Sequence, residues 1–107
     1  MEAVRVYADI HGLSPEASDE IRRSMPFDQA KYADRTLSVD YEGCYIDVEA
    51  FLDDCARLLD ADGWGKLDFI DQIDYRLTRY VIKKGEWKAK DVLVDNVVEK
   101  VHQEAGV

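Results

Sequence analysis

The pattern of apolar and polar positions along the chain predicts most of its elements. The chain is organised around the segment 47–59, which we expect to form an amphipathic helix. Its apolar positions recur at helical spacing and are Val48, Phe51, Leu52, Cys55, Leu58 and Leu59. Such spacing places these side chains on one face, which is typical of a helix that covers a core. We expect Asp47 to be the N-cap and Gly63 to mark the C-terminal stop.

Three more elements are predicted on the N-terminal side of this helix. Alternation of apolar and polar residues predicts strands over 3–10 and 36–42. Between them, Ser14 followed by Pro15 is typical of a helix start, and Pro26 would end that helix.

Three other stretches carry weaker patterns. We expect 27–34 to be a connection with one helical turn, and 44–46 to extend the sheet. A final amphipathic helix is expected near the C-terminus, with Asp91 or Asp95 as its cap and Gly106 at its end. Its apolar positions are Val94, Val97, Val98 and Val101.

The segment 66–82 fits both a helix and strands. Apolar residues at odd positions favour strands, whereas the spacing of Ile70, Ile73 and Leu77 would also suit a helix. We prefer strands because 80–82 is rich in strand-forming residues. The run 83–86 also looks like a hairpin turn, after which 87–90 would return as a partner strand.

The order strand, helix, strand, helix, strands, helix predicts a single α+β domain over residues 1–107. A small antiparallel sheet with about three helices packed on one face is the simplest architecture for that order. A ferredoxin-like sandwich is compatible with it. No apolar run is long enough to span a membrane, and the N-terminus lacks a signal-peptide pattern. We therefore expect a cytosolic protein in which Cys44 and Cys55 are reduced thiols.

The acidic residues are concentrated in one window of the sequence. The chain has a net charge of −9, and residues 40–74 contain eleven acidic residues against Arg57 and Lys66. This window therefore accounts for the whole net charge, which argues against direct binding to nucleic acid and favours a basic protein partner. The residues that we expect to bind this partner are Asp53, Asp54, Asp60, Asp62, Asp68, Asp71 and Asp74.

In general character the chain is similar to the small acidic inhibitors encoded by phages and mobile elements, which include anti-CRISPR and anti-restriction proteins. The likeness is one of composition, and it implies a nucleic-acid mimic that binds and inhibits or regulates a basic, nucleic-acid-binding protein. We expect no enzymatic activity and no cofactor. A homodimer is compatible with the pattern. The basic strands over 76–90, with aromatic residues among the charges, leave single-stranded nucleic acid as an alternative ligand.

Residues 60–71 resemble the calcium loop of EF-hand proteins. Asp60 and Asp62 fit loop positions one and three, Gly65 fits the turn at position six, and Asp68 fits position nine. The sequence departs from the pattern at Trp64, which stands where an oxygen ligand belongs, and at position twelve, where aspartate replaces glutamate. A calcium-binding module is the alternative that this resemblance implies, and it requires a helix over 66–82.

Residues 7–12 resemble the first metal motif of calcineurin-like phosphoesterases. Asp9 and His11 lie at the end of a predicted strand, directly before Gly12. The resemblance implies a small metal-dependent hydrolase, which is a weaker alternative because such a site needs further ligands from later strands. The other histidine, His102, lies on the last predicted helix.

Overall fold

Residues 3–93 are described by the structure, which is a computed structural model. Eight elements follow one another in this part of the chain. They are β1 (Val4–His11), α1 (Pro15–Ser24), β2 (Ala30–Ala33), β3 (Thr36–Gly43), α2 (Glu49–Leu58), β4 (Trp64–Asp71), β5 (Arg76–Lys83) and β6 (Glu86–Leu93).

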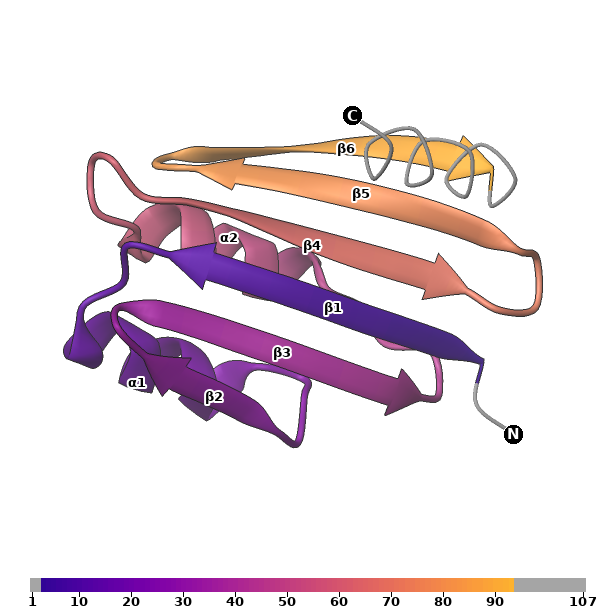
Figure 1. Cartoon of the computed structure of the whole chain (residues 1–107), viewed down its shortest axis with the longest axis horizontal. Coiled ribbons are helices and arrows are strands. Elements are labelled where there is room, and N and C mark those ends of the chain that lie inside the picture. The colour runs from indigo at the N-terminus through magenta and orange to yellow at the C-terminus, as the bar shows by residue number, and fades with distance from the viewer. Residues whose placement is uncertain (1–2, 94–107) are drawn as a thin grey trace, which may run out of the picture.

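The strands form one six-stranded sheet in the order β2-β3-β1-β4-β5-β6, and every neighbouring pair is antiparallel. Both helices lie on the same face of this sheet (Figure 1). The α+β class and the antiparallel sheet expected from the sequence are therefore confirmed. The structure shows two helices, and the third expected helix lies outside the described residues. No helix of the described part is long and apolar enough to cross a membrane.

The core lies between the sheet and the two helices. Strict alternation in β1 buries Val4, Val6, Ala8 and Ile10 against the helices, while the residues between them are only partly buried. From α2, Phe51, Leu52 and Cys55 enter the same core, as the sequence predicts. The apolar face of the sheet and the apolar faces of the helices therefore pack against each other in one layer. Burial of this layer holds the helices on the sheet.

Helix α1 begins as predicted. Ser14 is the N-cap, its Oγ accepts a hydrogen bond from the backbone N–H of Ala17 at 3.1 Å, and Pro15 occupies the first turn. Helix α2 differs in detail. Its N-cap is Val48, which makes no capping hydrogen bond with its side chain, whereas Asp47 lies one residue earlier and accepts from the backbone N–H of Glu49 at 3.0 Å.

The connection predicted over 27–34 is wrong, because it contains the edge strand β2. Ala30 and Tyr32 of β2 lie opposite Val39 and Leu37 of β3. The Tyr32 hydroxyl donates to the carbonyl of Leu13 at 2.6 Å, so a tertiary contact anchors a segment whose local pattern is weak. The predicted sheet extension over 44–46 is also wrong, since β3 ends at Gly43.

The prediction that Gly63 marks the C-terminal stop of α2 is wrong. The helix ends at Leu58, and Leu59 is its C-cap in an extended conformation. Gly63 lies in the following turn, where the backbone of His11 approaches it closely. A Cβ on Gly63 would stand 2.9 Å from the His11 carbonyl oxygen.

The ambiguous segment 66–82 is resolved as two strands, β4 and β5, joined by a hairpin around Tyr75. The predicted turn over 83–86 is present between β5 and β6, with Lys83 paired to Glu86 and Gly85 at φ +86°. Strand β6 is longer than the predicted 87–90.

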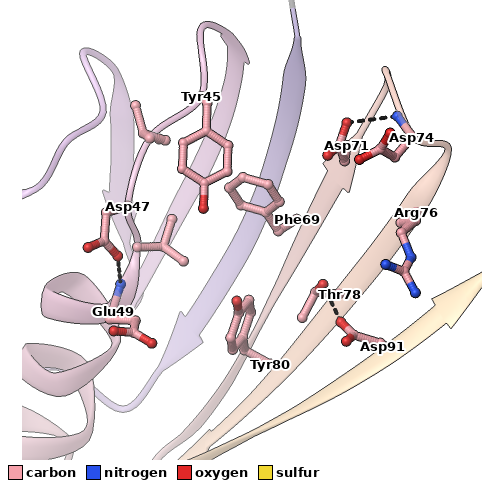
Figure 2. A pocket seen from close by; sticks show the side chains of 12 residues that line it. Tyr45, Asp47, Glu49, Phe69, Asp71, Asp74, Arg76, Thr78, Tyr80 and Asp91 are labelled. Atoms are coloured by element: carbon pink, nitrogen blue, oxygen red, sulfur yellow. Dashed lines mark hydrogen bonds between the residues drawn. The ribbon is translucent and has the colours of Figure 1, made fainter.

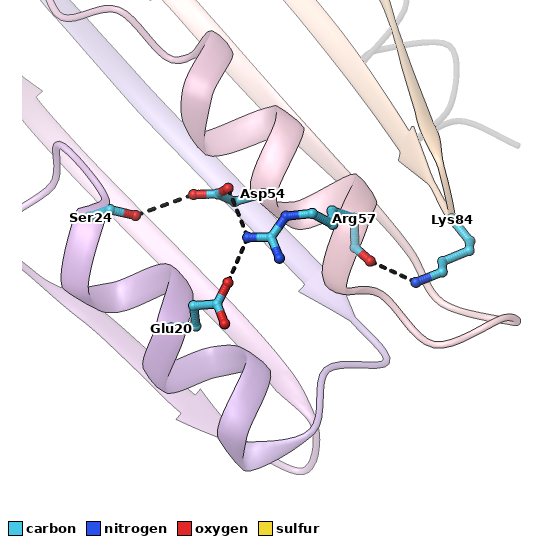
Figure 3. A network of polar contacts seen from close by, with 5 residues as sticks. All are labelled: Glu20, Ser24, Asp54, Arg57 and Lys84. Atoms are coloured by element: carbon cyan, nitrogen blue, oxygen red, sulfur yellow. Dashed lines mark hydrogen bonds and ion pairs between the residues drawn. The ribbon is translucent and has the colours of Figure 1, made fainter.

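A polar network joins the two helices on their outer side (Figure 3). Arg57 of α2 donates to Glu20 of α1 at 2.6 Å and to Asp54 at 3.2 Å, and Ser24 donates to Asp54 at 3.2 Å. Lys84 donates to the backbone carbonyl of Arg57 at 2.6 Å, near the C-terminal end of α2. A cation at this end of a helix is favoured by the helix dipole.

Candidate functional site

A cavity of about 460 Å³ opens on the helix side of the sheet, beside the N-terminal end of α2. We call it the acidic hollow (Figure 2). It is lined by Tyr45, Ile46, Asp47, Val48, Glu49, Phe69, Asp71, Asp74, Arg76, Thr78, Tyr80 and Asp91. It is formed by the loop before α2, the start of α2, and strands β4 to β6.

Three aromatic rings occupy the middle of the acidic hollow. Tyr45 comes from the loop after β3, Phe69 from β4 and Tyr80 from β5. The rings of Tyr45 and Phe69 meet edge to face, with 5.5 Å between their centroids. Figure 2 shows the hydroxyl groups of Tyr45 and Tyr80 in the space between the α2 side and the β5–β6 side of the hollow. The hollow therefore has aromatic faces and phenolic oxygens within one cavity.

Carboxylates stand on two opposite walls of the acidic hollow. Asp47 and Glu49 lie on the α2 side, and Asp71, Asp74 and Asp91 lie on the hairpin and β6 side (Figure 2). Among the described residues that line the cavity, Arg76 is the one cation. Five carboxylates therefore face a single guanidinium, which makes the potential in this cavity strongly negative.

Several of these carboxylates are held in place by hydrogen bonds. Asp71 accepts from the backbone N–H groups of Ile73 and Asp74 at 2.9 and 3.0 Å. Asp91 accepts from the Thr78 hydroxyl at 2.6 Å across the β5–β6 pair. These contacts orient the carboxylates while leaving acceptor capacity for a ligand.

The negative potential is reflected in the titration of Tyr80. Burial raises the pKa of Tyr80 above its ordinary value, and the nearby Tyr45 and the carboxylates of Asp91, Glu49 and Asp47 raise it further. A phenolate at this position is therefore disfavoured, first by burial and then by the neighbouring carboxylates.

Large apolar side chains are exposed around the acidic hollow. Tyr45 is 71% exposed, and Ile73 and Tyr75 of the adjoining β4–β5 hairpin are 61% and 71% exposed. Tyr75 also has φ +54°, which is uncommon for a bulky residue. Exposed aromatic residues beside a cavity are typical of protein-binding surfaces.

The structure brings only two of the seven predicted partner-binding residues to the acidic hollow. These are Asp71 and Asp74. Asp53 accepts a hydrogen bond from the indole of Trp87, and Asp54 belongs to the network between the helices. Both therefore have a structural role on α2.

The remaining three predicted residues lie elsewhere. Asp60 forms an ion pair with Arg35 beyond the end of α2, and Asp62 is exposed in the following turn. Asp68 points to the face opposite the helices, where it accepts two hydrogen bonds from Arg79 at 2.7 and 3.1 Å. The acidic window is therefore distributed over both faces and both ends of the sheet.

Sequence reasoning missed the aromatic residues of the hollow and Asp91. Asp47 and Glu49 lie within the acidic window, but they are not among the seven residues that the sequence predicts to bind a partner. Asp91 lies far from that window in sequence, and pairing of β5 with β6 places it opposite Thr78. Only the strand register shows that Asp91 belongs with acids of the window.

The loop that resembles an EF-hand lacks the second helix that this motif needs. Residues 64–71 form β4, and Asp60 is held by Arg35. Asp68 and Asp71 alternate along β4 and therefore point to opposite faces of the sheet. The described residues contain no group of three or more acidic, histidine or cysteine side chains placed to hold a metal ion.

The pair that resembles a phosphoesterase motif is engaged in hydrogen bonds with β3. Asp9 accepts from the Ser38 hydroxyl at 2.9 Å, and Nδ1 of His11 lies 3.1 Å from the Thr36 hydroxyl. The His11 ring lies against Trp64, with 4.5 Å between ring centroids. His102 lies outside the described residues, and within the described part Asp9 and His11 belong to no group of three or more side chains that could hold a metal ion.

The two cysteines differ in environment. Cys44 is exposed and Cys55 is fully buried in the core, where burial and, to a lesser degree, the charge of Asp54 raise the pKa of its thiol far above its ordinary value. Both thiols are free, which agrees with the sequence-based expectation. A buried neutral thiol is unreactive and acts as a small apolar side chain.

Comparison of the chain with known proteins finds no matching family model, no matching curated protein and no matching solved structure.

Proposed function

We propose that this protein is a non-enzymatic interaction module that binds a basic protein partner through the acidic hollow. The observation that carries the proposal is the meeting of five carboxylates and three aromatic rings in one cavity. Complementary charge steers a basic partner to the cavity, and the aromatic surface contributes contact area once the partner is bound. The exposed Tyr45, Ile73 and Tyr75 extend this surface around the cavity.

The sequence predicts a partner-binding surface formed by acids spread between Asp53 and Asp74, and the proposal limits this surface to the acidic hollow. A mimic of a nucleic-acid backbone would present a long row of unpaired charges, whereas Asp54, Asp60 and Asp68 are already paired with arginines of the same chain. The arrangement favours a localised contact with a basic segment. Inhibition of a nucleic-acid-binding partner follows if that segment is the one that contacts phosphates. A cytosolic location is a further prediction from the sequence.

We also infer the fold family of the main part of the domain. Strands β1 to β4 with α1 and α2 follow the order β-α-β-β-α-β, and the four strands lie in the order β2-β3-β1-β4. This is the order of a ferredoxin-like sandwich. The β5–β6 hairpin widens the sheet beyond it and supplies Tyr80, Arg76 and Asp91 to the acidic hollow.

Binding of a defined basic peptide, rich in arginine and lysine, tests the proposal by titration calorimetry at low and at raised salt. We expect a triple variant of the hollow (Asp47→Asn, Glu49→Gln, Asp91→Asn) to bind about tenfold more weakly, which corresponds to about 1.4 kcal/mol. A matched triple variant at exposed positions away from the hollow (Glu16→Gln, Asp19→Asn, Asp62→Asn) changes the net charge equally and should bind nearly as the original protein.

Three results decide the outcome. Weak binding by the hollow variant alone, together with strong salt dependence, supports the proposal. An equal loss in both triple variants would show that only the net charge matters, and the hollow would then be excluded as the site. Binding that is unaffected by either variant would also contradict the proposal.

A further inference from the structure

We infer that the acidic hollow recognises the guanidinium group of a single arginine side chain of its partner. This inference rests on the proposed function and specifies the group that enters the cavity. The feature that favours arginine over other cations is that hydrogen-bond acceptors and aromatic faces occupy the same cavity. Carboxylates stand on two opposite walls, and the rings of Tyr45, Phe69 and Tyr80 lie between them (Figure 2).

The arrangement of acceptors suits a planar group with many donors. A guanidinium has five N–H groups in one plane and therefore donates in several directions at once, whereas an ammonium group is a compact point charge. Glu49 on the α2 wall and Asp91 on the β6 wall offer acceptors from opposite sides. A guanidinium in the hollow has N–H groups that point toward both walls, whereas the donors of an ammonium group all radiate from one nitrogen.

The aromatic rings favour arginine for a second reason. A guanidinium is weakly hydrated and stacks on aromatic faces, so it loses less on leaving water than an ammonium group does. Tyr45 is the accessible ring, since it is 71% exposed, while Phe69 is buried and fixes the ring of Tyr45 through an edge-to-face contact. The cavity volume of about 460 Å³ lies within the range of ligand pockets and leaves room for one long side chain.

Arg76 gives the inference an independent test. It lines the hairpin side of the hollow and has no ion-pair partner among residues 3–93. Because it carries the same charge as the expected ligand, it opposes binding. Replacement by a neutral residue, Arg76→Gln, should therefore strengthen binding by about two- to fivefold, as expected for a partly exposed pair of charges. A gain of affinity cannot result from damage to the fold.

The experiment is an NMR titration that observes the ring protons of Tyr45, Phe69 and Tyr80. The probes are the blocked compounds N-acetyl-arginine methylamide, N-acetyl-lysine methylamide and the neutral N-acetyl-citrulline methylamide. We expect the arginine compound to shift all three ring signals, the lysine compound to bind about three- to fivefold more weakly, and the citrulline compound to leave the rings unchanged.

Variants locate the binding. Tyr45→Leu and Glu49→Gln should each weaken binding of the arginine compound, and Arg76→Gln should strengthen it. Glu16→Gln is the matched control, because Glu16 lies in the first turn of α1 as Glu49 lies in the first turn of α2. The control therefore loses the same interaction with a helix dipole but stands outside the hollow.

Failure of this inference is distinguishable from failure of the proposed function. Equal affinity for the arginine and lysine compounds would overturn the choice of arginine, while the hollow would remain a site for cations. If none of the compounds shifts the ring signals, the inference is overturned. The proposed function still stands in that case if the basic peptide binds the original protein and binds the triple variant of the hollow more weakly. Free arginine is titrated as a fourth probe, and if it binds more tightly than the blocked compound, the ligand is the free amino acid and the inference of a partner's side chain is overturned.

Discussion

The indole of Trp87 on β6 donates a hydrogen bond to Asp53 on α2, with 2.8 Å between Nε1 and Oδ1. The pair joins the last described strand to the helix that covers the centre of the sheet. Trp87 also meets the ring of Tyr80 edge to face, with 5.6 Å between centroids. A residue predicted to bind a partner therefore serves to attach the β5–β6 hairpin to the rest of the domain.

Replacement of Asp53 by alanine should reduce stability without affecting binding at the acidic hollow. Loss of this exposed hydrogen bond is expected to lower the free energy of unfolding by about 0.5 kcal/mol, because water can replace Asp53 as the partner of the indole N–H only in part. Urea unfolding monitored by tryptophan fluorescence measures the change. Asp19→Ala is the control, since Asp19 holds the corresponding fifth position of α1 and is exposed. An equal effect in both variants would show that the contact with Trp87 contributes nothing.

Two glycines with positive φ should differ in their tolerance of alanine. Gly12 has φ +92°, and a Cβ there would lie 2.7 Å from the Cα of Gly63. Gly85 has φ +86° but no atom within 4 Å of its Cβ position. Gly85→Ala should cost only the backbone strain of about 1–2 kcal/mol. Gly12→Ala adds a steric clash with the backbone, and thermal unfolding should show a clearly larger loss. Equal losses would contradict the close approach of Gly12 and Gly63.

The titration of Tyr80 should report the negative potential of the acidic hollow. Its pKa is raised above the ordinary value of 10.0, first by burial and then by Tyr45 and the neighbouring carboxylates. Ultraviolet difference spectroscopy should therefore show one tyrosine that ionises at higher pH than the exposed ones, and Tyr80→Phe should remove that step. In the triple variant of the hollow (Asp47→Asn, Glu49→Gln, Asp91→Asn), the step should move to lower pH.

The same shift predicts how stability depends on pH. Because the pKa of Tyr80 is higher in the folded than in the unfolded protein, the unfolded state loses this proton first as pH rises. The contribution of neutral Tyr80 to stability is thus complete below the ordinary pKa and is lost as pH rises through the folded-state value. Urea unfolding from neutral to alkaline pH should show a smaller decline for Tyr80→Phe than for the original protein. An identical decline would contradict the raised pKa.

The sequence alone determined the elements whose side chains follow one strong period. Alternation in 3–10 and the helical spacing in 47–59 each bury one face, so local pattern and tertiary environment agree. The start of α1 was equally predictable, because Ser14 and Pro15 act on backbone groups a few residues away. The α+β class and the antiparallel sheet followed from the order of these elements.

Only the tertiary structure decided where short or mixed segments belong. Strand β2 exists because β3 pairs with it and Tyr32 reaches Leu13, and neither contact leaves a strong local pattern. The sequence favoured strands over 66–82, and the structure confirms them, but local spacing alone also suited a helix, so pairing across the sheet made the decision.

Which residues form the candidate site was also decided by the tertiary structure. Sequence counting found the excess of acids in 40–74, but it could not show which carboxylates are already paired and which face a cavity. Asp68 and Asp71 lie three residues apart on one strand and point to opposite faces, whereas Asp47 and Asp91 are distant in sequence and line one hollow. The physical reason is that a strand reverses side-chain direction at every residue, while strand pairing unites residues of any separation.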